Sequence, residues 1–364
     1  LLNSYKTALK RGENIIMKKR IISLAAAAVF VIGTLAGCGN SSTQTTDTTA
    51  SSDASSSSGD LVTVRDAVMT GQLDQYATEI GLWQGIFEKY GIDLQTTEFV
   101  AGINTIDAVV NGTADIGMMA DYAAVNRLGN TRDATNLQIF SQISGGQAAL
   151  SGGLYVDPKY ADDPKSLDGS AGFMYQEGTV TYYYASKCIE YLGLDESKQN
   201  LINTDSSQTR LALIQKGGAS AVYANGSEAK YIEEAGWVQV ATSQEIGIQT
   251  GSYFLSTDKY ISENTDTLAK FLQAVDESTQ YINDHLDESA EYLADKLGLK
   301  AEDFKENWKN YSFEPGFSEE ATAHLEDIEK WGFEHGSFPK DYNVRDFINT
   351  DVAKIAFPDN VNIE

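Results

Sequence analysis

Residues 99–117 read FVAGINTIDAVVNGTADIG, a stretch in which one strand ends, a helix follows and another strand begins. The first strand is Ile92 to Phe99 (IDLQTTEF), where apolar and polar residues alternate. Gly102 then opens a helix, and Asp115 to Met119 (DIGMM) is a short further strand. The apolar face that we expect for this helix consists of Ile103, Ile106, Val109 and Val110.

The same order of elements begins upstream of this stretch. Leu61 to Met69 (LVTVRDAVM) is predicted to be a strand, and a helix follows from about Gln75 to Tyr90, where Gly91 ends it. Strand, helix, strand, helix and strand in series indicate a parallel sheet, because consecutive parallel strands need a crossover connection between them.

A second α/β unit follows. Its expected strands and helices are, in order, Ala171–Tyr175, Val180–Leu192, Asn200–Thr204, Ser207–Lys216 and Ser220–Tyr223. After Gly251 come a strand and a mainly helical tail, with the strand at Tyr253–Ser256 and amphipathic runs at Thr265–Asp284 and Ser318–Trp331. Roughly 300 residues after Asp60 suffice for two lobes with a cleft between them, and the loops after the strands are where such sheets bind small ligands.

The segment from Met17 to Cys38 reads MKKRIISLAAAAVFVIGTLAGC and is predicted to be a signal peptide. Its apolar run, Ile21 to Leu35, is shorter than the roughly 20 residues that span a bilayer. The ending Leu-Ala-Gly-Cys resembles the lipobox of bacterial lipoproteins, so we expect residues 17–37 to be removed and Cys38 to be lipidated. The alternative is an ordinary buried apolar segment. Translation is expected to start at Met17.

Residues 38–60 are predicted to be a flexible tether, since Asn40 to Asp60 contain no large apolar residue to bury. The expected location is therefore the extracytoplasmic face of the cell membrane, with the folded body held by the lipid at Cys38. The chain has 27 basic and 52 acidic residues, and six basic residues and one acidic residue precede Cys38. From Cys38 onward the net charge is about −30, which argues against nucleic acid as a partner.

Catalytic and metal-binding patterns are not found in the sequence, so we expect no enzyme, cofactor or metal. Cys188 lies in an apolar helical pattern and is predicted to be a packed hydrophobic residue. His285, His324 and His335 have no second ligand or base at metal-binding spacing, and a surface position is expected for each. Gly-x-Ser-x-Gly and phosphate-binding loop motifs are also absent.

The opening stretch, from Phe99 to Gly117, resembles the hallmark of nitrate/sulfonate/taurine-type (NMT1/THI5-like) solute-binding proteins of ABC importers. Ser166-Leu-Asp-Gly169, Glu177-Gly178-Thr179 and Gly218-Ala-Ser-Ala-Val222 resemble further segments of that family. Two positions depart from it: Ser220 stands where Asp is common, and Tyr223 to Glu228 replace a frequent aromatic-Glu-Pro stretch.

This resemblance implies a two-lobed α/β fold of the type II periplasmic-binding-protein class, with the ligand cleft between the lobes. Lobe 1 would comprise residues 61–152 and 251–364, and lobe 2 residues 153–250. From the two-lobe pattern we expect a binding subunit that captures a ligand by closing the cleft, with hinges near Ser151–Leu154 and Gly247–Ser252, and delivers it to an ABC permease and ATPase. A monomer is expected. A surface sensory lipoprotein and an enzyme are the alternatives from other classes.

The candidate ligand-binding residues follow predicted strands or open predicted helices, whose free N–H groups attract anions. They are Gln72, Asp74, Gln75, Tyr76, Gly102, Asn104, Thr105, Asp121, Tyr122, Glu177, Gly178, Thr179, Thr181 and Asn225. For Asn104, Thr105 and Thr179, helix capping is the alternative role.

The expected ligand is a small polar or zwitterionic molecule of the sulfonate, taurine or nitrate class. Asp74, Asp121 and Glu177 favour a ligand that carries an amine as well as an anionic group. Tyr182, Tyr183 and Tyr184 follow one another on a predicted helix, where one is expected to face the cleft while the others pack. An aromatic wall there would suit a flat ring, so a pyrimidine-like or aromatic ligand is the alternative.

Overall fold

The structure of the protein is a computed structural model that describes residues 61–145, 152–167, 169 and 172–363. All of them belong to one compact unit, Ser57–Glu364. The predicted signal peptide, Cys38 and the tether lie outside the described residues, as does Ser151 of the first predicted hinge. In the part of the chain that is described, no helix has the length and apolar character needed to cross a bilayer.

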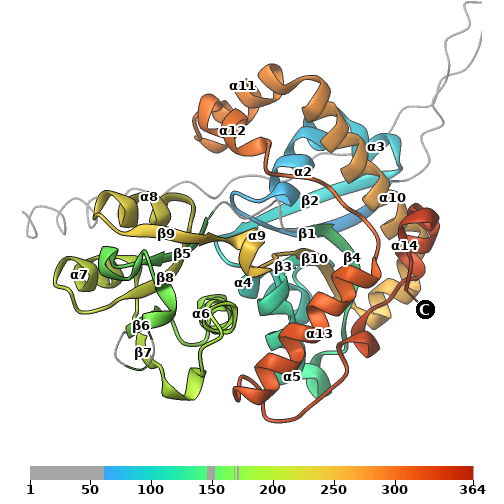
Figure 1. The fold of residues 1–364 in the computed structure, drawn as a ribbon. Coiled ribbons are helices and arrows are strands. Elements are labelled where there is room, and N and C mark those ends of the chain that lie inside the picture. Colours follow the sequence, from blue (N-terminus) through green and yellow to red (C-terminus); the bar gives the residue numbers. More distant parts are fainter. Residues whose placement is uncertain (1–60, 146–151, 168, 170–171, 364) are drawn as a thin grey trace, which may run out of the picture. The chain divides into compact units, whose positions relative to one another are not determined.

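The first sheet has the strand order β2-β1-β3-β10-β4 (Figure 1). Its strands are β1 (Val62–Met69), β2 (Ile92–Phe99), β3 (Ile116–Ala120), β4 (Leu137–Ser144) and β10 (Ser252–Thr257). The strand β1 pairs in parallel with both β2 and β3, which confirms the predicted parallel unit. The late strand β10 runs antiparallel between β3 and β4, so the chain returns to this sheet after leaving it.

The second sheet is made entirely from residues between the two visits to the first, in the order β7-β6-β8-β5-β9. Its strands are β5 (Gly152–Val156), β6 (Gly172–Tyr175), β7 (Asn200–Asn203), β8 (Ala221–Asn225) and β9 (Val238–Thr242). The strand β6 is parallel to β7 and β8, whereas β5 is antiparallel to β8 and β9. The predicted mixed α/β class with two sheets is confirmed.

The helices pack on the faces of both sheets. They are α2 (Leu73–Trp83), α3 (Ile86–Lys89), α4 (Gly102–Val110), α5 (Asp121–Thr135), α6 (Val180–Tyr191), α7 (Ser207–Gln215), α8 (Gly226–Glu234), α9 (Ser243–Ile246), α10 (Asp258–Asp284), α11 (Leu286–Leu297), α12 (Ala301–Trp308), α13 (Glu319–Glu334) and α14 (Asp351–Ala356). The single helix predicted from Gln75 to Tyr90 is wrong. Gly85 takes the left-handed conformation at φ 68° and separates α2 from α3.

The predicted apolar face of α4 is half wrong. Ile106 and Val109 are buried, but Ile103 is 53% exposed and Val110 36% exposed. The helix is rotated so that Thr105 faces the sheet, where its hydroxyl donates to the Met118 carbonyl at 2.5 Å. Gly117 of β3 permits this approach, because a Cβ there would lie 3.0 Å from the Thr105 carbonyl oxygen.

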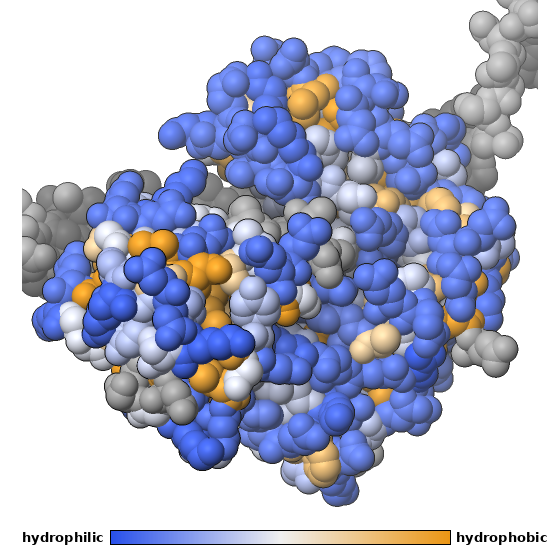
Figure 2. Space-filling model, viewed as in Figure 1, coloured by the Kyte–Doolittle hydropathy of each residue, from blue (hydrophilic) through white to orange (hydrophobic). Residues whose placement is uncertain are grey.

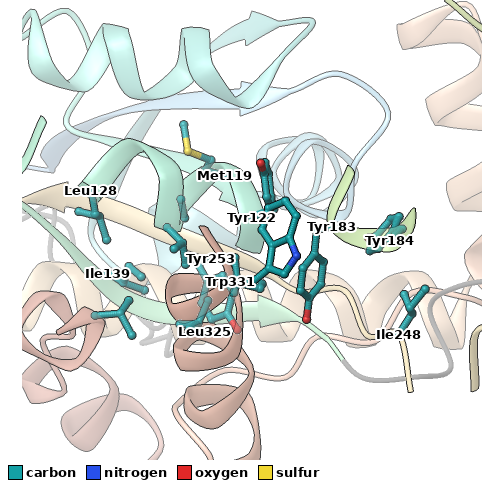
Figure 3. Close-up of a cluster of buried hydrophobic side chains, with 14 of the residues drawn as sticks. Met119, Tyr122, Leu128, Ile139, Tyr183, Tyr184, Ile248, Tyr253, Leu325 and Trp331 are labelled. Atoms are coloured by element: carbon teal, nitrogen blue, oxygen red, sulfur yellow. The ribbon is translucent and has the colours of Figure 1, made fainter. Parts of the chain in front are cut away.

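Two large clusters of buried apolar side chains hold the described unit together. One lies between the first sheet and the helices α2 and α10, and includes Ile80, Phe254 and Phe271. The other joins side chains from both sheets and from the helices α5, α6 and α13, the helices contributing Tyr122, Tyr183 and Trp331 (Figure 3). The face seen in Figure 2 is mostly hydrophilic, as expected for a chain with 52 acidic and 27 basic residues. The helix α13 therefore links the two halves of the fold.

Candidate ligand-binding site

A cavity of about 760 Å³, here called the larger cavity, lies where three helices begin. Its lining includes Gly102 at the start of α4, Asp121 at the start of α5, and Thr179 with Val180 at the start of α6. The helices α4 and α5 pack with the first sheet and α6 with the second. Both halves of the fold therefore contribute to one site.

Helix starts carry partial positive charge, because their first N–H groups have no partner within the helix. The first residues of α4 and α5 are preceded by Ala101 and Ala120, whose methyl side chains offer no cap. In α5 the amides of Asp121 and Tyr122 already donate to the Gly251 carbonyl and to Asp121 Oδ1. In α6 the Thr179 hydroxyl accepts from the amide of Thr181 at 3.3 Å. The cavity is consequently suited to an anionic group.

Six of the fourteen predicted site residues come together in this cavity. They are Gly102, Asp121, Tyr122, Glu177, Gly178 and Thr179. Gln72 lines a neighbouring cavity of about 340 Å³, which shares Ala120 and Thr250 with the larger one. Thr179 also caps α6, which is the alternative role considered for it. The Thr181 hydroxyl accepts from the amide of Gln176 at 2.8 Å and contacts the Thr179 hydroxyl.

The carboxylate of Asp121 is only 2% exposed and is bound by the protein itself. Oδ1 accepts from the amide of Tyr122 at 2.7 Å, and Oδ2 accepts from the amide of Gly251 at 2.8 Å. Nε2 of His324 lies 2.8 Å from the same Oδ2. An amine on a ligand would have to compete with these bonds. The structure thus gives Asp121 an anchoring role at the wall of the cavity.

Glu177 is the more accessible carboxylate of the cavity. Its side chain is exposed, and Oε2 accepts from the Asn203 amide group at 3.3 Å. The backbone amide of Glu177 donates to Asn203 Oδ1 at 3.1 Å, so the loop before α6 is held to the end of β7. Gly178 follows with φ 74°, a conformation that glycine adopts without strain. Of the predicted carboxylates, Glu177 is best placed to meet a ligand amine.

Asp74, Gln75 and Thr105, which are among the candidate ligand-binding residues, do not line the larger cavity and are all buried. Asp74 accepts from the Met69 amide at 3.0 Å and Gln75 from the Gly71 amide at 2.8 Å, so both close the turn after β1. Burial raises the pKa of Asp74 to about 7. The Thr105 hydroxyl is bonded to the Met118 carbonyl and so faces the sheet.

Three further predicted residues lie apart from the larger cavity. Asn104 is exposed on α4 and is not part of the lining. Tyr76 packs edge-on against Phe304 at 5.0 Å between ring centroids. Asn225 precedes α8 at the end of β8 and is half-buried. Their positions are explained by packing and chain geometry, without a ligand.

Arg127 also lines the larger cavity, although it is not among the residues predicted from the sequence. It lies in the second turn of α5, and its side chain is 16% exposed. Nη2 lies 2.8 Å from Asp107, while the buried Nε has no hydrogen-bond partner among the described residues. A guanidinium is matched to carboxylate, phosphate and sulfonate oxygens by its planar donors. Arg127 adds a full positive charge to a site already favoured by helix starts.

Aromatic rings form the other wall of the cavity. Tyr122, Tyr182, Tyr184 and His335 belong to its lining, and the ring of His335 is stacked on Trp331 at 4.2 Å. The expectation that one of the three consecutive tyrosines would face the cleft is therefore wrong, because two do. Tyr183 packs among the other rings (Figure 3), and its hydroxyl donates to Asp327 of α13 at 2.7 Å.

The predicted environment is found for Cys188 but not for His324. Cys188 is fully buried among apolar side chains, as predicted, and burial raises its pKa. The surface position expected for His324 is wrong, since its side chain is 9% exposed and bound to Asp121. His335 is half-buried beside Glu196 at 3.2 Å. Groups of three or more His, Cys, Asp or Glu side chains that would hold a metal do not occur among the described residues.

Solved structures share this arrangement of sheets and helices. The aliphatic sulphonate binding protein SsuA from Escherichia coli superimposes with a TM-score of 0.65 at 17% identity, covering 79% of this chain and 92% of its own. The nitrate-binding protein NrtA from Synechocystis PCC 6803 gives 0.55 at 15% identity, with 82% and 89% covered. The desulfurization enzyme DSZB gives 0.58 at 11% identity, with 82% and 99% covered.

At these identities the likeness is one of fold alone. The fold is that of periplasmic binding proteins, and the enzyme DSZB shares it. A sequence model of the family described as NMT1/THI5 like matches residues 80–289. The chain belongs to the NMT1/THI5-like family, and the resemblance seen in the sequence is confirmed. No curated protein matches the chain.

Proposed function

We propose that this protein is the extracytoplasmic substrate-binding subunit of an ABC importer and that its ligand is a small organic anion of the sulfonate class. The observation that carries the proposal is the larger cavity, where three helices begin beside Arg127. Similar folds in proteins described as binding sulphonate and nitrate support it. The ligand is captured and delivered to a permease without being chemically changed.

A sulfonate suits this cavity better than a cation does. Its oxygens accept hydrogen bonds from helix N–H groups and from the Arg127 guanidinium, and charge-assisted bonds of this kind are stronger than neutral ones. Asp121 does not oppose the anion strongly, because its oxygens are already bound by the amides of Tyr122 and Gly251 and by His324. A zwitterion such as taurine remains suitable, with its amine near Glu177.

An aromatic or pyrimidine-like anion is the second candidate ligand. Tyr182 and Tyr184 both line the cavity and present ring surface to it. Tyrosine rings stack against flat ligands with a gain of about 0.5–1.5 kcal/mol beyond area burial. The helix starts and Arg127 would then bind the sulfonate or carboxylate group of the ring compound.

Capture is proposed to proceed by movement of two lobes, residues 61–152 with 251–364 and residues 153–250. The crossing near Gly247–Ser252 is one hinge, and Thr250 within it lines both cavities. A lipid at Cys38 and the tether that follows would hold the body, as a monomer, beside its permease at the membrane surface. This location rests on the sequence pattern from Met17 to Cys38.

Catalysis by thiol chemistry is disfavoured, although the fold also occurs in a desulfurization enzyme. Apart from Cys38 the sequence holds one cysteine, Cys188, which is fully buried with a raised pKa. A thiol in that state is a poor nucleophile, because the thiolate is the reactive form. Binding without chemistry is the simpler account of the site.

Isothermal titration calorimetry of the purified protein tests the proposal. The panel comprises ethanesulfonate, taurine, nitrate, benzenesulfonate and cytosine, and we expect saturable one-to-one binding of at least one sulfonate. Arg127→Gln should weaken that binding about 10- to 100-fold, since one charge-assisted hydrogen bond is lost. Lys159→Gln is the control, because Lys159 is 58% exposed and pairs with Asp157 on the surface. Absence of binding to every compound in the panel would contradict the proposal.

A further inference from the structure

His335 is the residue at which the larger cavity meets a second hollow. This hollow, here called the side groove, has a volume of about 560 Å³ and is lined mainly by residues of α6 and α13. Among the described residues, His335 is the one that lines both the larger cavity and the side groove. The imidazole ring therefore stands at the boundary between the proposed ligand site and the groove.

Each ring nitrogen of His335 faces an oxygen acceptor. Nδ1 lies 2.8 Å from the Trp331 carbonyl oxygen, and Nε2 lies 3.2 Å from Oε1 of Glu196. A neutral imidazole has one N–H group and one lone pair, whereas an imidazolium has two N–H groups. The imidazolium satisfies both contacts, because a neutral ring would point its lone pair at one of these oxygens. Imidazole is more basic than a carboxylate, so the proton of such a pair resides on the ring.

The position of His335 at the end of α13 favours the same charge. The last carbonyl groups of a helix carry partial negative charge, and Nδ1 donates to one of them, that of Trp331. The ring is also stacked on the Trp331 indole, with ring centroids 4.2 Å apart and planes 16° from parallel. A cation over the face of tryptophan is stabilised by the negative charge of that face. The helix end and the indole both stabilise the protonated ring.

The charged groups around His335 are mainly acidic. Those that line the larger cavity or the side groove are six carboxylates (Asp121, Glu177, Glu190, Glu196, Asp327 and Glu334) and three basic groups (Arg127, Lys187 and Lys330). Two tyrosines of α6 also line the larger cavity, and both are neutral near pH 7, since burial raises the pKa of Tyr184 and burial followed by Glu196 raises that of Tyr182 to about 12. The excess of carboxylates favours a positive charge on the ring.

We propose that His335 is an imidazolium in the folded protein and that it supplies, together with Arg127, the positive charge that binds the anion in the larger cavity. The inference rests on the proposed function and assigns to that site a dependence on pH. His335 lines the larger cavity whereas Glu196 lines only the side groove, so the positive end of the pair faces the anion.

Loss of the ring proton changes the charge of this wall. The protonated ring and Glu196 form a pair with no net charge, at 3.2 Å. After the ring loses its proton, Glu196 is a carboxylate without its counter-charge behind the wall, and it repels a bound anion. Anion affinity therefore falls as pH rises through the range in which imidazolium groups lose a proton.

Nitrogen-15 NMR of the unmodified protein, without ligand, tests the charge of the ring. Histidine labelled with nitrogen-15 shows which ring nitrogens carry a proton, and the signals missing from His335→Gln identify those of His335. We expect both nitrogens of His335 to be protonated at pH 6. A ring with a proton on one nitrogen alone at that pH would overturn the inference and leave the proposed function untouched.

Calorimetry with ethanesulfonate at pH 6 and at pH 8.5 tests the role of that charge. The sulfonate stays ionised over this range, so a change in affinity comes from the protein. Wild-type affinity should fall about tenfold between the two pH values, since one unit of charge is lost at the cavity wall. Equal affinity at the two pH values would overturn the inference.

Two variants assign the effect to His335 and Glu196. His335→Gln keeps the other titratable groups of the site, His324 and Asp121 included, and should bind ethanesulfonate weakly at both pH values. The double variant His335→Gln with Glu196→Gln removes the uncompensated carboxylate as well. It should recover at least fivefold of the affinity lost by His335→Gln at pH 6, again with no dependence on pH. A pH dependence that persists in His335→Gln would overturn the inference.

The outcomes separate the inference from the proposed function. Sulfonate binding that does not change with pH would overturn only the role of His335. Absence of sulfonate binding at both pH values would overturn the proposed function and, with it, the place of His335 in the site. The NMR and the wild-type titrations measure the unmodified protein, so their results do not depend on how the variants fold.

Discussion

Asp121 and Gly251 are bound to each other twice, although 130 residues separate them. The amide of Asp121 donates to the Gly251 carbonyl at 2.9 Å, and Asp121 Oδ2 accepts from the Gly251 amide at 2.8 Å. The pair ties the start of α5, which lines the larger cavity, to the segment through which the chain re-enters the first sheet. His324 of α13 completes the arrangement at 2.8 Å from the same oxygen.

Asp121→Ala should therefore lower the free energy of unfolding by about 2–4 kcal/mol, because it leaves the buried Gly251 amide without its side-chain acceptor. Urea denaturation followed by circular dichroism measures the change. Asp303→Ala is the control, since Asp303 is exposed and its one ion pair, 3.7 Å from Lys300, lies at the surface. Equal stability of the two variants would show that the Asp121 bonds contribute little.

The buried carboxyls Asp66 and Asp74 should make the protein less stable as pH rises. Burial raises the pKa of Asp66 well above its usual value and that of Asp74 to about 7. The protonated forms are thus favoured in the folded state. The stabilisation that comes from protonating these carboxyls is fully present below about pH 4, near the pKa of an unfolded aspartate. The part due to Asp74 is lost as pH rises through about 7.

Asp74→Asn isolates this effect, because the amide oxygen still accepts from the Met69 amide but cannot ionise. Between pH 5 and pH 8 the wild type should lose on the order of 2–4 kcal/mol more than the variant. Urea denaturation at the two pH values gives the comparison. A variant with the same pH dependence as the wild type would argue that Asp74 titrates normally.

Tyr183→Phe should destabilise the link between the two halves of the fold. Its hydroxyl donates to Asp327 at 2.7 Å, and Lys187 lies 2.8 Å from the same carboxylate oxygen. We expect a loss of about 1–2 kcal/mol in thermal or urea unfolding. Tyr231→Phe provides the matched control, since Tyr231 is 56% exposed. If both variants unfold alike, the bond between α6 and α13 is not a significant stabilising contact.

Parts of the fold are predictable because their signals are local. Strand β2 alternates apolar and polar residues, and its predicted range, Ile92–Phe99, matches the structure. Helix α5 is not predicted, because in its sequence, DYAAVNRLGNTRDAT, the apolar stripe of Tyr122, Val125 and Leu128 is short and lies among polar and small residues. Its helical state depends on packing against α13 and the first sheet, which no window of local sequence contains.

The site is less predictable than the fold, because its contacts join distant residues. Asp121 meets His324 across 203 positions, and nothing near either residue indicates the pair. Asp74 follows a strand, as a rim residue would, yet its carboxylate turns back to the Met69 amide. Arg127 lies in the second turn of a helix that the pattern does not reveal, so its approach to the cavity cannot be seen from sequence.

The larger cavity is proposed to recognise negative charge. The decisive measurement is calorimetric titration of the protein with ethanesulfonate and with ethanesulfonamide, its uncharged analogue of similar shape. We expect one-to-one binding of ethanesulfonate and at least 100-fold weaker binding of the sulfonamide, because the helix starts and Arg127 favour the charged group. Equal affinity for the two compounds, or binding of the sulfonamide alone, would contradict it.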